Sequence, residues 1–163
     1  MNKEENNIVW ARLSSLYAGD KTSVFFRPEE GDEVVLGFLN DDPRHAIILG
    51  SLHSSSKHPP PETFKVEKEN SVKGIATKAG MSIEFNDKEK TFKISLNEKN
   101  YLFMDEKGIQ IKDDTNKNSI VLSDKGIEIK DDTNKNSIIL DDKGLNIDVS
   151  KDIMIKGKSL TYE

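Results

Sequence analysis

Residues 107–124 read KGIQIKDDTNKNSIVLSD, and residues 125–142 read KGIEIKDDTNKNSIILDD. The two copies are 18 residues long and differ at only three positions. Repetition at a short fixed period is typical of solenoids and stacked arrays, in which one unit cannot bury its apolar face alone. Apolar residues recur in each copy with the period of two that indicates a β-strand. The stretch therefore predicts a stack of short strands, with cores at residues 109–111, 120–122, 127–129 and 138–140.

The connections between these strands are equally regular. A wide polar turn at residues 113–118 recurs at residues 131–136, and a tighter turn lies between them at residues 123–126. Gly108, Gly126 and Gly144 occupy the same place in successive tight turns. A glycine at this place predicts a backbone with positive φ, which only glycine adopts without a steric penalty.

A single copy of this pattern has no obvious core. One turn of a triangular β-helix would need residues 113–118 as its third wall, and these include no apolar residue to turn inward. A free-standing single-layer sheet is only marginally stable. We therefore predict an intertwined homotrimeric β-helix or β-prism, in which three copies surround a shared axis. Its predicted trimer core consists of Ile109, Ile111, Ile120, Leu122, Ile127, Ile129, Ile138, Leu140, Leu145, Ile147, Ile153 and Ile155.

The same pattern predicts further strands on both sides of the repeats. Apolar runs at residues 81–85, 92–96 and 101–104 precede the repeats, and runs at residues 145–149, 153–155 and 160–162 follow them. We expect Phe85, Phe92 and Phe103 to point inward, so that the shaft has an aromatic base and an aliphatic continuation.

Composition agrees with an obligate assembly. Of the 163 residues, 34% are hydrophobic and 33% are charged, which leaves little core for one chain. The net charge of −5 comes from interleaved acidic and basic residues, so we expect no nucleic-acid partner. Cysteine is absent, which excludes disulfides and thiolate metal sites. No apolar run approaches membrane-spanning length, and residues 1–7 are polar and acidic, unlike a signal peptide.

A second pattern precedes the repeats. Residues 8–16, 22–26, 33–39 and 46–52 are strand-like and are separated by turn signals rich in Gly, Asp and Pro. Strands without a helical period between them predict a small antiparallel barrel or sandwich, so the whole chain is expected to be all-β. We divide the chain into a β module at residues 1–53, a Ser/Pro linker at 54–61, a transition at 62–80 and a needle at 81–163.

The block RPEEGDEVVLGFLNDDPRHAIILGSLH at residues 27–53, with WARL at residues 10–13, closely resembles the OB-fold segment of VgrG-type spike proteins. These are the central spikes of type VI secretion systems, with relatives in contractile phage tails. The resemblance implies an OB-like barrel followed by a trimeric β-helical needle. The family has one or two barrel strands before the strand of Trp10, so the resemblance leaves open whether this barrel is complete.

The resemblance also implies a function. It predicts a structural, membrane-puncturing spike of a contractile injection machine, assembled in the cytoplasm and then ejected to the exterior or into a target cell. A PAAR-type tip protein or an effector is expected to dock near Leu160 and Tyr162, and the hub and tail tube are expected at the other end. The His-x-His pair that holds iron in some members is missing here. The alternative function is a trimeric adhesin or tail-fibre shaft.

No enzymatic or cofactor site is predicted. The pairs Asp113-Asp114 and Asp131-Asp132 resemble calcium ligands, but they lie in turns that favour Asp for its backbone hydrogen bonds. A solvated surface of alternating charges also lacks the desolvated cleft of an acid/base pair. Trp10, Phe25 and Phe26 could stack on nucleic-acid bases, yet the acidic loops beside them favour core packing.

Overall fold

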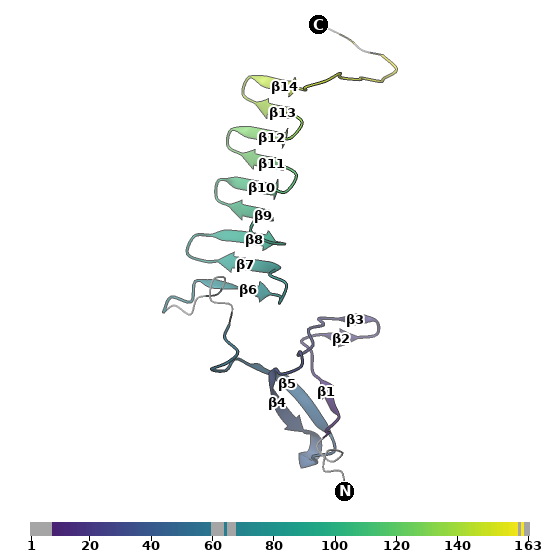
Figure 1. Cartoon of the computed structure of the whole chain (residues 1–163), viewed down its shortest axis with the longest axis vertical. Helices are drawn as coiled ribbons and strands as arrows, with labels where there is room; N and C mark the ends of the chain where they lie inside the picture. The colour runs from purple at the N-terminus through teal and green to yellow at the C-terminus, as the bar shows by residue number, and fades with distance from the viewer. Residues whose placement is uncertain (1–7, 60–63, 65–67, 160, 162–163) are drawn as a thin grey trace. The chain divides into compact units, whose positions relative to one another are not determined.

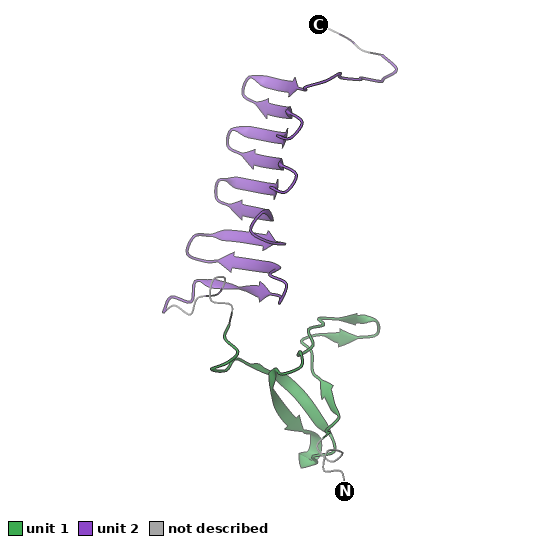
Figure 2. Ribbon diagram, viewed as in Figure 1, with its two compact units in different colours: residues 1–59 green, residues 60–163 purple. Residues whose placement is uncertain are grey.

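The computed structural model describes residues 8–59, 64, 68–159 and 161. Its regular elements are fourteen strands and one short 3₁₀ helix, η1 (Leu39–Asp41) (Figure 1). The chain divides into two compact units, residues 1–59 and residues 60–163 (Figure 2). None of the described residues form a helix of the length and hydrophobicity needed to cross a bilayer. The predicted all-β class is confirmed.

The first unit contains one small sheet and one hairpin. The sheet has the order β1-β5-β4, and the hairpin pairs β2 with β3. Between Val35 and Leu36 the pairing of β4 with β5 shifts register, as at a β-bulge. The bounds are β1 (Ala11–Leu13), β2 (Ala18–Gly19), β3 (Thr22–Ser23), β4 (Glu33–Phe38) and β5 (Ala46–Leu52).

This unit departs from the predicted antiparallel barrel in one pairing. β4 and β5 are antiparallel, but β1 runs parallel to β5, with Ala11 opposite Ala46. The chain between them includes β2, β3, β4 and η1, which is long enough for either orientation. The described strands form a three-stranded sheet and a separate hairpin, not a closed barrel.

The predicted packing of the aromatic residues in this unit was also wrong. Trp10 is 90% exposed, Phe25 71% and Phe26 62%. Ala46 is the only apolar residue that is buried among those the structure describes. A sheet of three strands has no second layer to cover such side chains, so the first unit displays its apolar residues.

The second unit is a single antiparallel sheet of nine strands in the order β14-β13-β12-β11-β10-β9-β8-β7-β6. In Figure 1 the strands lie one above the other like rungs, and each is joined to the next by a turn. Their bounds are β6 (Val72–Ala76), β7 (Ser82–Asn86), β8 (Thr91–Ser95), β9 (Asn100–Asp105), β10 (Gly108–Asp113), β11 (Asn118–Ser123), β12 (Gly126–Asp131), β13 (Asn136–Asp141) and β14 (Gly144–Asp148).

Every ladder of this sheet joins strands that are consecutive in one chain. β10, for example, pairs with β9 on one side and with β11 on the other. Strands of other chains therefore cannot enter between them. The predicted intertwining of three chains is not what the structure shows, because the nine strands of one chain form a continuous sheet. In a prism, this sheet would be one complete wall.

The alternation of side chains separates two faces. Ile109 and Ile111 lie on one, which we call the apolar face, and Gln110 and Lys112 lie on the other, the charged face. Phe85 and Phe92 lie on the apolar face, and their ring centroids are 5.0 Å apart. Phe103 pairs with Gln110 and with Lys93, so it lies on the charged face. The prediction that Phe103 points inward was wrong.

The turns confirm the predicted role of glycine. Gly108, Gly126 and Gly144 have φ of 150°, 124° and 116°. The N–H groups of the tight turns are held by the residue that precedes them: Asp105 Oδ1 accepts hydrogen bonds from the backbone N of Lys107 at 2.8 Å and of Gly108 at 3.0 Å. Ser123 Oγ and Asp141 Oδ1 accept the equivalent hydrogen bonds from Lys125 and Lys143, so an Asp or Ser before the turn and the glycine at its end together specify the tight turn.

Successive wide turns are hydrogen-bonded to one another. The backbone N of Asp132 donates to the carbonyl of Lys117 at 2.9 Å, and Thr133 Oγ1 donates to the carbonyl of Asn116 at 2.9 Å. The backbone N of Asp114 donates to the carbonyl of Lys99 in the same way. One edge of the sheet is thus connected from turn to turn at the 18-residue period.

Replacement of Gly126 by Ala should destabilise the protein more than replacement of Gly144. A Cβ on Gly126 would lie 1.9 Å from the carbonyl oxygen of Leu140, whereas a Cβ on Gly144 meets nothing within 4 Å. Both substitutions carry the cost of a positive φ, about 1–3 kcal/mol, and only Gly126→Ala adds a clash with the backbone. Urea unfolding of the two variants would measure the difference, and equal losses would contradict the structure.

The sheet ends at β14, before the predicted strand at residues 153–155. Residues 153–155 form no strand, and Ile153 and Ile155 are exposed. The prediction of a strand there was wrong, since three apolar residues without a paired neighbour do not specify one. Leu160 and Tyr162, the predicted tip-docking residues, lie outside the described residues.

Candidate functional site

The apolar face carries two continuous rows of aliphatic side chains across β10 to β14. Cross-strand pairing places the first row next to the tight turns, and we call it the leucine row: Ile109, Leu122, Ile127, Leu140 and Leu145. It places the second row nearer the wide turns, and we call it the isoleucine row: Ile111, Ile120, Ile129, Ile138 and Ile147. Ten of the twelve predicted trimer-core residues thus share one face, while Ile153 and Ile155 follow β14.

These rows are largely uncovered within one chain. Ile129 is 40% exposed, Leu140 42% and Leu145 63%. Full burial of one such side chain is worth about 1.5–3 kcal/mol. A continuous apolar surface of this kind marks a site of association.

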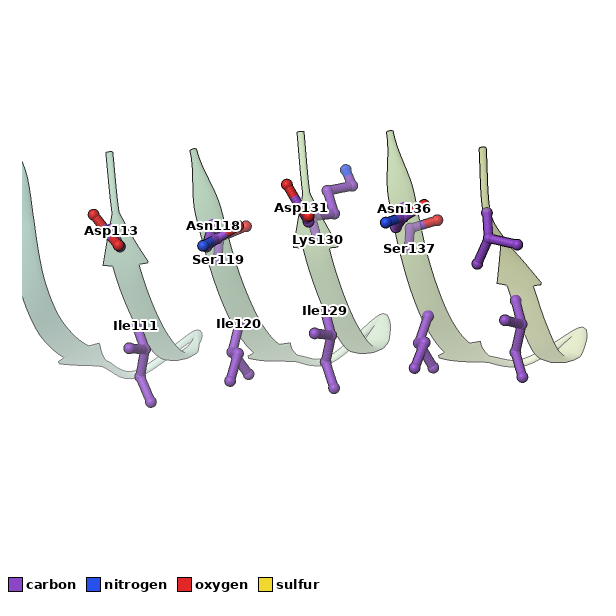
Figure 3. A pocket seen from close by; sticks show the side chains of 13 residues that line it. Ile111, Asp113, Asn118, Ser119, Ile120, Ile129, Lys130, Asp131, Asn136 and Ser137 are labelled. Atoms are coloured by element: carbon purple, nitrogen blue, oxygen red, sulfur yellow. The ribbon is translucent and has the colours of Figure 1, made fainter. Parts of the chain in front are cut away.

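A groove runs along this face. It has a volume of about 450 Å³ and is lined by the isoleucine row and by the polar ends of the same strands. Figure 3 shows Ile111, Ile120 and Ile129 along one side of the groove, with Asp113, Asn118, Asp131 and Asn136 aligned along the other. The surface is therefore apolar with one polar rim.

The rim is a third row on the apolar face, which we call the polar row: Asn100, Asp113, Asn118, Asp131 and Asn136. Its carboxylates are fixed within their own turns. Asp113 Oδ2 accepts a hydrogen bond from Asn116 Nδ2 at 2.7 Å, and Asp131 Oδ2 accepts one from Asn134 Nδ2 at 2.6 Å. The predicted role of these residues in turns is confirmed.

The same hydrogen bonds keep the two carboxylates ionised. The side-chain amide of Asn116, and then its backbone N–H, lower the pKa of Asp113. Asn134 lowers the pKa of Asp131 in the same way. Both pKa values therefore lie below the ordinary value of 3.8.

Acid should weaken the sheet through these groups. A carboxyl whose pKa is lowered by folding adds stability above its unfolded pKa and loses it as pH falls through the folded pKa. We expect the melting temperature to fall below about pH 4, where protonation of Asp113 and Asp131 becomes favoured in the unfolded chain. The Asn116→Ala/Asn134→Ala variant, followed by circular dichroism, should show a smaller acid-dependent decrease. An unchanged decrease would contradict the assignment.

The opposite face has the character of a solvated surface. Lys130 Nζ lies 2.7 Å from Glu128 Oε1, and this hydrogen bond raises the pKa of Lys130. Lys93 Nζ lies 5.4 Å from the centroid of the Tyr101 ring. Such exposed pairs contribute little to stability. Within the described residues, no three His, Asp or Glu side chains are grouped as metal ligands.

Sequence reasoning missed the polar row. It assigned Asp113 and Asp131 to turns, and did not place them on the same face as the apolar rows. The signal was present, because Ile109, Ile111 and Asp113 are separated by two residues each.

Comparison with known proteins identifies relatives of this chain. Residues 1–53 match the family model of the type VI secretion system/phage-baseplate injector OB domain. Two spike proteins of the type VI secretion system of Pseudomonas aeruginosa, VgrG1a and VgrG1b, are each 30% identical over 83 residues. This alignment includes 51% of the chain, and 13% and 11% of the two relatives.

The actin cross-linking toxin VgrG1 of Vibrio cholerae is 36% identical over 59 residues, which are 36% of this chain and 5% of the toxin. The chain thus spans only a small part of the length of these relatives. The matches confirm the resemblance predicted from residues 10–13 and 27–53: the chain is a relative of VgrG-type baseplate spike proteins, with an injector OB domain at residues 1–53.

Proposed function

We propose that three copies of this chain form the rigid shaft of a membrane-puncturing spike in a contractile injection machine. The observation that carries the proposal is the uncovered apolar face of the nine-stranded sheet in a relative of spike proteins. Three such walls facing one axis would bury the leucine and isoleucine rows together. The charged faces would then form the outside of the shaft.

Stiffness is the activity that this arrangement would provide. Each wall is a continuous antiparallel ladder, and the stacked wide turns add hydrogen bonds along one edge. Bending the shaft would require many of these bonds and the packed apolar rows to open together. A charged exterior would allow the shaft to pass lipid headgroups with only transient membrane contact.

The partners in this proposal follow from the position of a shaft within a spike. The hub and tail tube would adjoin the OB-like unit, and a PAAR-type tip protein or effector would cover the far end. An exposed strand edge, here that of β14, favours such a cover because it can pair with another chain. The shaft would assemble in the cytoplasm and leave the cell when the machine contracts.

Within this chain we propose a mechanical role without catalysis. Asp113 and Asp131 accept hydrogen bonds from Asn116 and Asn134, and Glu128 pairs with Lys130, so each is held in a structural contact. A toxin activity such as the one named for the Vibrio cholerae relative would belong to a separate effector segment.

Electron microscopy of injection particles that contain a tagged copy of the full chain would test this function. A gold label against the tag should lie on the central axis of the particle, at the end of the tail tube. A label on peripheral fibres would contradict the spike and favour an attachment role instead. An untagged particle is the control for non-specific labelling.

A further inference from the structure

The edge of the sheet that holds the tight turns carries a lysine in each turn that precedes β10, β12 and β14. Lys107, Lys125 and Lys143 lie in the three tight turns, separated by 18 residues, and we call them the lysine edge. In the part of the chain that the structure describes, their side chains form no ion pair. These cations are therefore available to a partner.

The other edge carries carboxylates at the same levels. Asp113 ends β10, which begins directly after Lys107, and Asp131 ends β12, which begins directly after Lys125. Neither carboxylate pairs with a cation among the described residues, although both lie on the rim of the apolar groove. Of the described strands, β10 and β12 thus each begin next to a lysine without an ion pair and end in an aspartate without one.

Rotational symmetry would bring these edges together. Each chain forms a whole wall, so three walls around an axis along the stack meet at three corners. At each corner the tight-turn edge of one copy faces the wide-turn edge of the next, at the same height. Lys125 and Asp131 belong to the same strand level, and therefore a pure rotation places the lysine of one copy beside the aspartate of its neighbour.

We propose that the rim of the groove is a docking site for the lysine edge of a second copy, so that Lys107 and Lys125 of one chain pair with Asp113 and Asp131 of the next. This inference rests on the proposed trimeric shaft and specifies how its walls join. The contact is head-to-tail, which closes a ring of three without an unused edge.

The pairing explains why anionic groups border a face that must be covered. A carboxylate that loses water needs a compensating charge, and a lone one in an apolar interface is costly. The lysine of the neighbour supplies that charge while its methylene stem covers the end of the isoleucine row. A two-fold contact would instead bring two tight-turn edges or two wide-turn edges together, and neither forms this pairing.

Cross-linking distinguishes this contact from others. In one chain, residues 125 and 131 lie at opposite ends of β12, about 20 Å apart at the usual rise per strand residue. A short bismaleimide cannot span that distance, so in the full-length K125C/D131C variant it can only join different copies. The protein has no native cysteine to interfere. The K107C/D113C variant tests the equivalent pair should the first variant fold poorly.

We expect covalent trimers from K125C/D131C and from K107C/D113C, and single chains from K125C or D131C alone, on denaturing gels. Light scattering before cross-linking shows whether the protein is a trimer, and the cross-links then show whether its walls join head-to-tail. A trimer that gives no cross-link in either double variant, or that cross-links in a single variant, would overturn the head-to-tail contact and leave the shaft intact. A monomer would overturn the shaft itself.

Discussion

Replacement of Ile129 by Asp should abolish the trimer. Ile129 is in the middle of the isoleucine row, between Ile120 and Ile138. In a three-walled shaft the substitution would place three carboxylates around one dry axis, and each would cost several kilocalories per mole without a cation beside it. Sedimentation velocity should therefore find the variant as monomer or aggregate at concentrations where the parent protein is a trimer.

Ile139→Asp is the matched control for this experiment. Ile139 lies on β13 and pairs with Glu128, so it belongs to the charged face. The same change of residue there alters strand propensity and charge but leaves the apolar face intact. We expect Ile139→Asp to remain a trimer with a modestly lower melting temperature. Equal effects of the two substitutions would show that the apolar face has no special role in assembly.

Removal of one complete repeat should shorten the shaft without unfolding it. Deletion of residues 111–128 joins Gln110 to Ile129, which then occupies the place of Ile111. Two strands are lost, and at the usual strand spacing the shaft becomes shorter by about 10 Å. A trimer with cooperative thermal unfolding is the expected result, measured by light scattering and circular dichroism.

Deletion of one residue fewer should have the opposite outcome. Removal of residues 111–127 joins Gln110 to Glu128, which places Glu128 on the apolar face and Ile129 on the charged face. A shift of one residue exchanges the faces of the strand that follows. We expect this variant to lose the trimer. A stable trimer from the shorter deletion, or an unfolded chain from the longer one, would contradict the register of the sheet.

The regular part of the fold could be predicted because its signals are local. Alternation of apolar residues specifies strands, and the glycine repeated in the tight turns indicates the reversals between them. That Ile109 and Ile111 share one face was predicted correctly for the same reason. These are properties of a few consecutive residues, and they do not depend on the rest of the chain.

The errors concern features that depend on which strands pair with each other. β9 contains four consecutive apolar residues, 101–104, so alternation could not decide which of them face inward. The pairing of Met104 with Ile109 and of Leu102 with Ile111 places Phe103 on the other face. Alternation also cannot say whether a neighbouring strand comes from the same chain, which is why the intertwined arrangement was expected. Alternation also does not specify the relative direction of two paired strands, so the parallel pairing of β1 with β5 was not predicted.

The aliphatic residues of the candidate site were predicted, but the groove and the polar row were not. The sequence indicated which aliphatic residues share a face, and the structure adds the groove and the polar row beside them. That these residues form the core of a trimer remains a prediction. It rests on the uncovered apolar face of the single chain.

The mass of the purified full-length chain in solution, measured by size-exclusion chromatography with multi-angle light scattering, shows whether three copies assemble. We expect a single species of three times 18.4 kDa. A well-folded species of 18.4 kDa, stable across a wide range of protein concentrations, would contradict it.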